Sequence, residues 1–254
     1  MIPIKNNIPT DTFPFVTLAL ILANFIVYLV AIRHGGSFIS GPDAFEEVKY
    51  GAVPKLLTHC LGQDEVVRAQ GVACVSGSPS GGVPTWSTAF TAMFMHASIL
   101  HIGGNMLFLW IFGNNVEDAM GHMKYFLFYI LGGLAALALQ VAVGPNSTAP
   151  TLGASGAIAA VLGGYILLYP RARVLTLVII IFFFTVIELP AIGMLGIWFA
   201  EQAVFASTNL TNPTGGGGGV AYFAHIGGFA FGLLTVKLLA TRRRTRPVAA
   251  ARML

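Results

Sequence analysis

The sequence has 254 residues, of which 56% are hydrophobic and 9% are charged. A soluble domain of this size carries about 25% charged residues, so the composition excludes an ordinary soluble protein and predicts an integral membrane protein. The net charge of +4 does not indicate nucleic-acid binding, because the basic residues stand mainly at the ends of apolar segments. We therefore expect a lipid bilayer as partner and no nucleic acid.

Six apolar segments are long enough to cross a bilayer core, which requires about 20 residues. They are approximately 13–32, 91–114, 125–143, 152–169, 189–207 and 220–240. We predict an all-α membrane protein, a six-helix bundle with a long outer loop over about 33–90. A transmembrane domain at 13–240 would follow a short cytoplasmic N-terminus at 1–12 and precede a basic cytoplasmic tail at 241–254. No small-residue cleavage site follows the first segment closely, so we expect it to remain in the mature protein.

The distribution of basic residues predicts the orientation. With six spans and both termini in the cytoplasm, 10 of the 14 Lys and Arg residues lie inside. A seventh span at 174–187 would place the arginine-rich tail outside, against the positive-inside tendency. That stretch, rich in β-branched and aromatic residues, is therefore predicted to lie at the membrane interface or under the bundle on the cytoplasmic side. The lack of a targeting extension favours a prokaryotic plasma membrane.

Both cysteines, Cys60 and Cys74, fall in the predicted outer loop. Their spacing is not typical of a zinc or redox site, so we expect no metal. The sequence is compatible with two free thiols and with a disulfide between them. An oxidising outer location would permit the disulfide, which would close a loop of about 15 residues and contribute about 3 kcal/mol.

Polar side chains inside three of the spans require an explanation, because such groups are unfavourable in a bilayer. For any one of them, an interhelical hydrogen bond is the ordinary explanation. The second span carries His101 and Asn105 on one helix face, the fourth opens with Ser155, and the sixth carries His225. These three spans run in the same direction in the predicted topology. All four residues therefore fall about 5–15 Å below the outer surface.

Small residues would let the fourth and sixth helices approach closely, as in other small-xxx-small pairs. The two stripes are Ser155, Ala159 and Gly163, and Ala224, Gly228 and Gly232. We expect this packing to bring the Ser155 hydroxyl near the His225 ring.

A serine beside a neutral histidine predicts nucleophilic catalysis of amide hydrolysis, with Ser155 as nucleophile and His225 as general base. The Ser155 backbone N–H and the side chains of His101 and Asn105 would stabilise the oxyanion. No carboxylate stands near His225 in the sequence, and the sequence does not show whether Glu201 reaches it, so we predict a dyad. The G-x-S-x-G motif of α/β-hydrolases is absent, because residue 157 is alanine.

Over about 13–240 the sequence resembles the rhomboid family of intramembrane serine proteases. The matching motifs are His96-x4-His101-x3-Asn105, Gly153-Ala154-Ser155-Gly156 and Ala224-His225-x2-Gly228-x3-Gly232. The resemblance implies the Ser155–His225 dyad and an oxyanion site formed by His101, Asn105 and the Ser155 amide. It also implies transmembrane-helix substrates cut near the outer membrane face, and no cofactor. Supporting roles are implied for His96, Gly153, Gly156, Gly228 and Gly232.

One further motif matches the family, two positions depart from it, and a glycine run precedes the last span. Glu117-x3-Gly121 matches a structural pattern of the family that ties a helix end to its neighbouring loop. Ser87 follows Trp86 where some members have arginine, and Ala159 stands where some have an aromatic residue on the base. The glycine run at 215–219 is either a mobile cap over the site or a spacer.

Two other functions compete with the protease interpretation. An inactive rhomboid-like binding protein usually lacks the serine or the histidine, and both are present here. A transporter or channel could use intramembrane His and Asn, but the sequence shows no paired acidic residues or broken-helix repeats. Ser155-dependent labelling by a serine-reactive probe would distinguish the protease from both.

Overall fold

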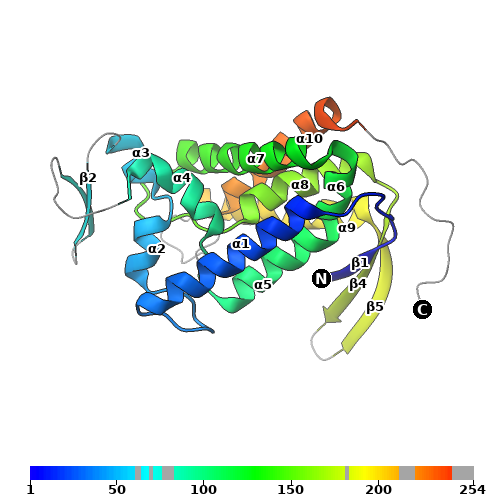
Figure 1. Ribbon diagram of the computed structural model, residues 1–254, viewed down its shortest axis with the longest axis horizontal. Helices are drawn as coiled ribbons and strands as arrows, with labels where there is room; N and C mark the ends of the chain where they lie inside the picture. The colour runs from blue at the N-terminus through cyan, green and yellow to red at the C-terminus, as the bar shows by residue number, and fades with distance from the viewer. Residues whose placement is uncertain (61–63, 69–70, 76–82, 181–182, 212–220, 242–254) are drawn as a thin grey trace.

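The computed structural model of the chain describes residues 1–60, 64–68, 71–75, 83–180, 183–211 and 221–241. Most of these residues are helical (Figure 1). The long helices are α1 (Phe15–Ala31), α5 (Ile99–Phe108), α7 (His122–Val143), α8 (Ser155–Leu168), α9 (Ala191–Thr211) and α10 (Tyr222–Leu239). A π-helical turn, η4 (Leu109–Gly113), joins α5 to α6 (Asn114–Met120).

Among the described residues, three helices are long and apolar enough to cross a membrane: Phe15–His34, His122–Val143 and Tyr222–Leu239. A fourth span results if the helical pair Thr85–Phe94 and Ile99–Met120, bent by 77°, counts as one. Helix α8 is apolar but has only 14 residues. These helices support an integral membrane protein, whereas the predicted count of six spans is not confirmed.

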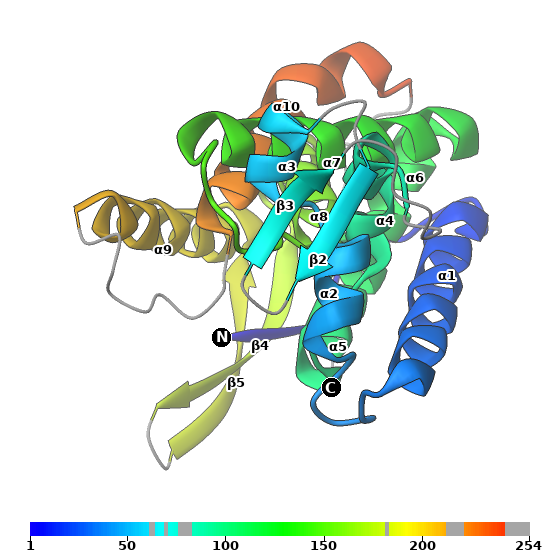
Figure 2. The ribbon, with the colours of Figure 1, turned by 90° about the vertical axis from the view of Figure 1, so that its left-hand side faces the viewer.

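Helix α8 lies at the centre of the bundle. Its residues 157–165 are all buried, as expected of a helix that is apolar on every side. Helices α7 and α10 pack against α8 and against each other, and Figure 2 shows α9 and α1 on opposite sides of it. The contact between α8 and α10 is a backbone contact: a Cβ on Gly228 would overlap the carbonyl oxygen of Gly156, and one on Gly232 would overlap that of Ala160. This close approach confirms the packing that the small-residue stripes predict.

Residues 174–180 and 183–187 stand in two paired β-strands, so the all-α prediction is wrong here. Strands β4 (Arg173–Ile180) and β5 (Phe183–Pro190) pair in antiparallel fashion, and β1 (Ile2–Asn6) pairs with β4. β-Branched and aromatic residues pack well on a pleated surface, and they outweigh the helical tendency of an apolar segment. The pairing holds the N-terminal strand beside the connection between α8 and α9. In the predicted topology, the N-terminal strand and this connection both lie on the cytoplasmic side.

The predicted outer loop also contains regular structure. It includes η1 (Ile32–His34), α2 (Ala44–Tyr50), α3 (Pro54–His59), the hairpin β2 (Asp64–Arg68) and β3 (Gly71–Val75), and η2 (Thr85–Ser87). Two short helices, α4 (Thr88–Thr91) and η3 (Ala92–Phe94), lead from it to α5. Figure 1 shows the β2–β3 hairpin at the opposite end of the molecule from the β1–β4–β5 sheet.

Cys60 packs with Val53 and Leu56 in a small core of the segment predicted to be the outer loop, and it forms a disulfide. The described part of the chain holds no free cysteine. The only other cysteine in the sequence, Cys74, stands in β3, whose side chains lie outside the description. For Cys60, the disulfide alternative is therefore confirmed.

The fully buried carboxylate of Glu117 ties the end of α6 to the start of α1. It accepts hydrogen bonds from the backbone N–H groups of Val16 at 2.9 Å and Thr17 at 2.8 Å, and from the Thr17 hydroxyl at 2.6 Å. Gly121, at φ +81°, ends α6 in a backbone conformation that favours glycine. Glu117-x3-Gly121 thus has the structural role that the resemblance implies.

Candidate active site

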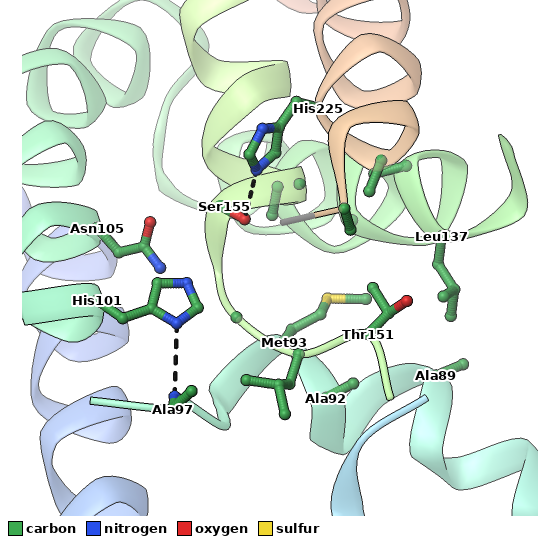
Figure 3. Close-up of a pocket in the computed structure, with 18 of the residues that line it drawn as sticks. Ala89, Ala92, Met93, Ala97, His101, Asn105, Leu137, Thr151, Ser155 and His225 are labelled. Carbon is green, nitrogen blue, oxygen red and sulfur yellow. Dashed lines mark hydrogen bonds between the residues drawn. The ribbon is translucent and has the colours of Figure 1, made fainter. Parts of the chain in front are cut away.

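Ser155 and His225 meet at the interface of α8 and α10. Ser155 is the first residue of α8, and His225 stands in the first turn of α10. The Nε2 atom of His225 lies 2.8 Å from the Ser155 hydroxyl oxygen (Figure 3). The structure therefore brings together the two side chains that the sequence predicts as nucleophile and base.

The backbone of the two residues before Ser155 is held by hydrogen bonds. Gly153, at φ +118°, donates its N–H to the carbonyl of Ala92 at 2.8 Å, and a Cβ there would lie 2.8 Å from Nε2 of His101. His96 is 1% exposed, and its Nε2 accepts the N–H of Ala154 at 3.4 Å. Both residues therefore support the site by holding the chain that presents Ser155.

His101 and Asn105 face Ser155 from α5 (Figure 3). The Nδ1 atom of His101 accepts the N–H of Ala97 at 3.4 Å, which leaves Nε2 as the protonated nitrogen of a neutral ring. The Nδ2 atom of Asn105 is buried and has no hydrogen-bond partner. A buried donor without a partner is rare in folded proteins, so the amide is available for a ligand oxygen.

These groups line one cavity of about 560 Å³ between α5, α7, α8 and α10. Most of its other lining side chains are small or apolar: Ala89, Ala92, Met93, Ala136, Leu137 and Ala224. The cavity therefore combines a few polar groups with a largely apolar lining, which is typical of a ligand-binding pocket.

Helix α9 adds contacts to His225 that the sequence interpretation missed. The Nδ1 atom of His225 lies 2.7 Å from Oε1 of Gln202, which is buried, and the ring centroids of Trp198 and His225 are 5.7 Å apart. Glu201, whose reach the sequence left open, is exposed. A polar residue inside an apolar helix was the available signal for Gln202, the same signal that identified His225. Trp198 supplies an aromatic ring beside His225, although Ala159 stands at the family's aromatic position.

A second glutamine, Gln140 on α7, holds the start of α10. Its Oε1 accepts the N–H of Ala224 at 3.2 Å, one of the donors that a helix N-terminus leaves unsatisfied. The glycine run at 215–219 lies outside the described residues. No group of three or more His, Cys, Asp or Glu side chains in the described part of the chain could hold a metal ion.

The chain is similar to known proteins over the part that carries this site. The family model described as Rhomboid domain matches residues 84–242. Rhomboid protein 1, mitochondrial, of Saccharomyces cerevisiae is 33% identical over 167 residues, which cover 63% of this chain and 44% of that protein. Rhomboid-like protein 11, chloroplastic, of Arabidopsis thaliana is 30% identical over 159 residues, which cover 61% of this chain and 53% of that protein.

Presenilin-associated rhomboid-like protein, mitochondrial, of Homo sapiens is 25% identical over 189 residues, which cover 70% of this chain and 44% of that protein. The chain thus spans about half the length of the curated relatives it matches. The family match includes α5, α8 and α10, the helices that carry all four predicted site residues. By this match, the chain belongs to the rhomboid family.

Proposed function

We propose that this protein is an intramembrane serine endopeptidase that cleaves transmembrane helices near the outer membrane face. The observation that carries the proposal is the 2.8 Å approach of the Ser155 hydroxyl to Nε2 of His225. A serine alone is a weak nucleophile, and a neutral imidazole within hydrogen-bond reach is what activates it. Family membership supports the same chemistry.

The reaction needs one proton transfer for each bond change. The Ser155 hydroxyl gives its proton to Nε2 of His225 while its oxygen attacks the scissile carbonyl carbon. The imidazolium then gives this proton to the leaving amine, which yields an acyl-enzyme on Ser155. A water molecule then loses a proton to the same nitrogen as its oxygen attacks the ester carbon. The imidazolium returns that proton to the departing Ser155 oxygen, which frees the serine and leaves the ring neutral.

The oxyanion would accept hydrogen bonds from three donors on two helices. The Nδ2 amide of Asn105 is buried without a partner, and Nε2–H of His101 borders the same cavity. The Ser155 backbone N–H stands at the start of α8, where N–H groups have no intrahelical partner and the helix dipole is positive. Donors fixed in this way before the reaction are the main source of stabilisation for such intermediates.

The substrate would have to unwind locally. A transmembrane helix keeps its carbonyl groups in internal hydrogen bonds, because the bilayer offers no other donors. The cavity of about 560 Å³ has room for a short extended segment beside Ser155. We therefore expect cleavage next to small or helix-weakening residues close to the membrane surface.

For the orientation, we propose that both termini lie in the cytoplasm and that the site lies near the opposite face. The pairing of β1 with β4 supports a common side for the N-terminal segment and the connection from α8 to α9. The names of the relatives refer to mitochondria and chloroplasts, so they do not support the expected prokaryotic plasma membrane.

The test combines a fluorophosphonate probe, which reacts with activated serines, and a purified transmembrane substrate in liposomes. The wild-type protein should be labelled and should cleave, whereas Ser155→Ala should do neither while it remains folded and membrane-embedded. Wild-type cleavage by Ser155→Ala would show that the catalytic assignment is wrong. A wild-type protein that binds the substrate helix without labelling or cleavage would instead indicate the inactive binding protein.

A further inference from the structure

We infer that Gln202 is a positioning residue for the base, so that the site is a Ser155–His225–Gln202 series rather than a dyad. This inference rests on the proposed function. It adds a third group, supplied by α9, a helix that carries none of the family motifs found in the sequence.

The protonation state of His225 requires an acceptor at Nδ1. To take the Ser155 proton, Nε2 must be unprotonated, so a neutral ring carries its proton on Nδ1. The Oε1 atom of Gln202 lies 2.7 Å from Nδ1 and is placed to accept that N–H. This hydrogen bond favours the tautomer in which Nδ1 carries the proton. It also fixes the rotation of the ring, because Gln202 then holds Nδ1 while Ser155 holds Nε2.

Burial strengthens the assignment. His225 is 9% exposed and Gln202 is 8% exposed, so water competes little for the bond between them. A buried Nδ1–H without an acceptor would be unfavourable, and rotation of the ring would remove Nε2 from Ser155 to relieve it. Gln202 therefore stabilises the one ring orientation in which the base reaches the nucleophile.

Trp198 reinforces this placement from the same helix face. It precedes Gln202 by four residues, one helical turn, and its ring lies 5.7 Å from the imidazole at an interplanar angle of 38°. Glu201, which directly precedes Gln202, is exposed. Two consecutive turns of α9 thus contact His225, so the position of α9 controls the orientation of the base.

The acceptor is a neutral amide, which distinguishes its role from that of a carboxylate. A carboxylate would stabilise the imidazolium by a charge-assisted hydrogen bond, about twice as strong as a neutral one. Gln202 offers orientation and the correct tautomer with little charge stabilisation. Its removal should therefore affect turnover of the bound substrate and leave substrate affinity almost unchanged.

The experiment compares Gln202→Met with Gln202→Glu in liposomes. Methionine fills similar space without an acceptor, whereas glutamate retains a carboxyl oxygen at the same distance along the side chain. We expect Gln202→Met to lose roughly tenfold or more in kcat, the equivalent of one hydrogen bond, with KM within twofold or so of wild type. Gln202→Glu should recover most of that loss, and Glu201→Gln should have wild-type kcat and KM.

A purely structural role for Gln202 would give a different pattern. Equal losses in Gln202→Met and Gln202→Glu, or a wild-type kcat in Gln202→Met, would overturn the inference; thermal unfolding shows that each variant is folded. If Gln202→Met is unfolded, Gln202→Leu with the same measurements replaces it. Failure of the proposed function itself would appear separately, as a wild-type protein that the fluorophosphonate probe does not label.

Discussion

Replacement of Gly228 by alanine tests whether the backbone contact between α8 and α10 sets the geometry of the proposed Ser155–His225 dyad. The new Cβ would overlap the carbonyl oxygen of Gly156 and would stand 3.1 Å from its carbonyl carbon and 3.2 Å from the Cβ of Ala159. Carbon atoms in contact are normally about 3.5–4.0 Å apart. The two helices must therefore separate by about 1 Å at this level, because backbone atoms cannot move aside as a flexible side chain does.

Both members of the dyad lie close to this contact. Ser155 precedes Gly156 directly, and His225 stands three residues before Gly228. A separation of about 1 Å would lengthen the 2.8 Å hydrogen bond beyond useful range. A displacement of that size in a catalytic group costs on the order of 10²-fold in rate. Overpacking would also lower the free energy of unfolding by about 1–3 kcal/mol.

The assay measures kcat on a transmembrane substrate in liposomes, together with the rate of fluorophosphonate labelling. Gly103→Ala is the matched control, since a Cβ there meets nothing within 4 Å and the same gain in helix propensity applies. Gly228→Ala should be slow in both measurements, and Gly103→Ala should match wild type. A Gly228→Ala protein with wild-type kcat would refute the reasoning, because the close approach would then not control the dyad.

Two further predictions follow from buried polar groups. Asn105→Ala should lower kcat by about 10²–10³ at most, through the loss of one oxyanion donor; a wild-type kcat would remove Asn105 from the site. Glu117→Ala should destabilise the protein by several kcal/mol, because each buried donor left without a partner costs about 1–3 kcal/mol. Thermal unfolding in detergent measures this loss. Glu188→Ala, which breaks an exposed ion pair with Arg173, serves as control and should change stability by less than about 1 kcal/mol.

The contact between Ser155 and His225 could be predicted from the sequence because polar residues are rare within apolar membrane segments. Ser155 and His225 stand in apolar surroundings, and the small-residue spacing indicates which helix faces meet. Helix length and direction then determine the depth of each group, so the two side chains could be placed at the same level before any tertiary structure was known. The 2.8 Å contact between them agrees with that placement.

The β-hairpin could not be predicted in the same way. Hydropathy distinguishes apolar from polar segments, but a continuous apolar run has no period that separates a strand from a buried helix. Residues 174–180 pair with residues 183–190, and β4 also pairs with β1, which lies about 170 residues earlier in the chain. The β-branched and aromatic composition was the only local sign, and the pairing partner lay too far away for local spacing to reveal it.

Ser155 and His225 are held in place in different ways, which explains why the sequence did not reveal the role of Gln202. Ser155 is placed by the backbone: Gly153, Gly156 and Gly228 allow close approaches that only glycine permits, and glycine is visible in a sequence. His225 is oriented by side chains from α9, whose contact depends on how that helix lies beside α10 rather than on any spacing within one helix. Backbone packing between α8 and α10 therefore fixes the distance between the helices, and α9 fixes the rotation of the imidazole. Because these two sets of contacts are separate, we expect a change in α9 to disable the proposed base, His225, while the proposed nucleophile, Ser155, stays in place.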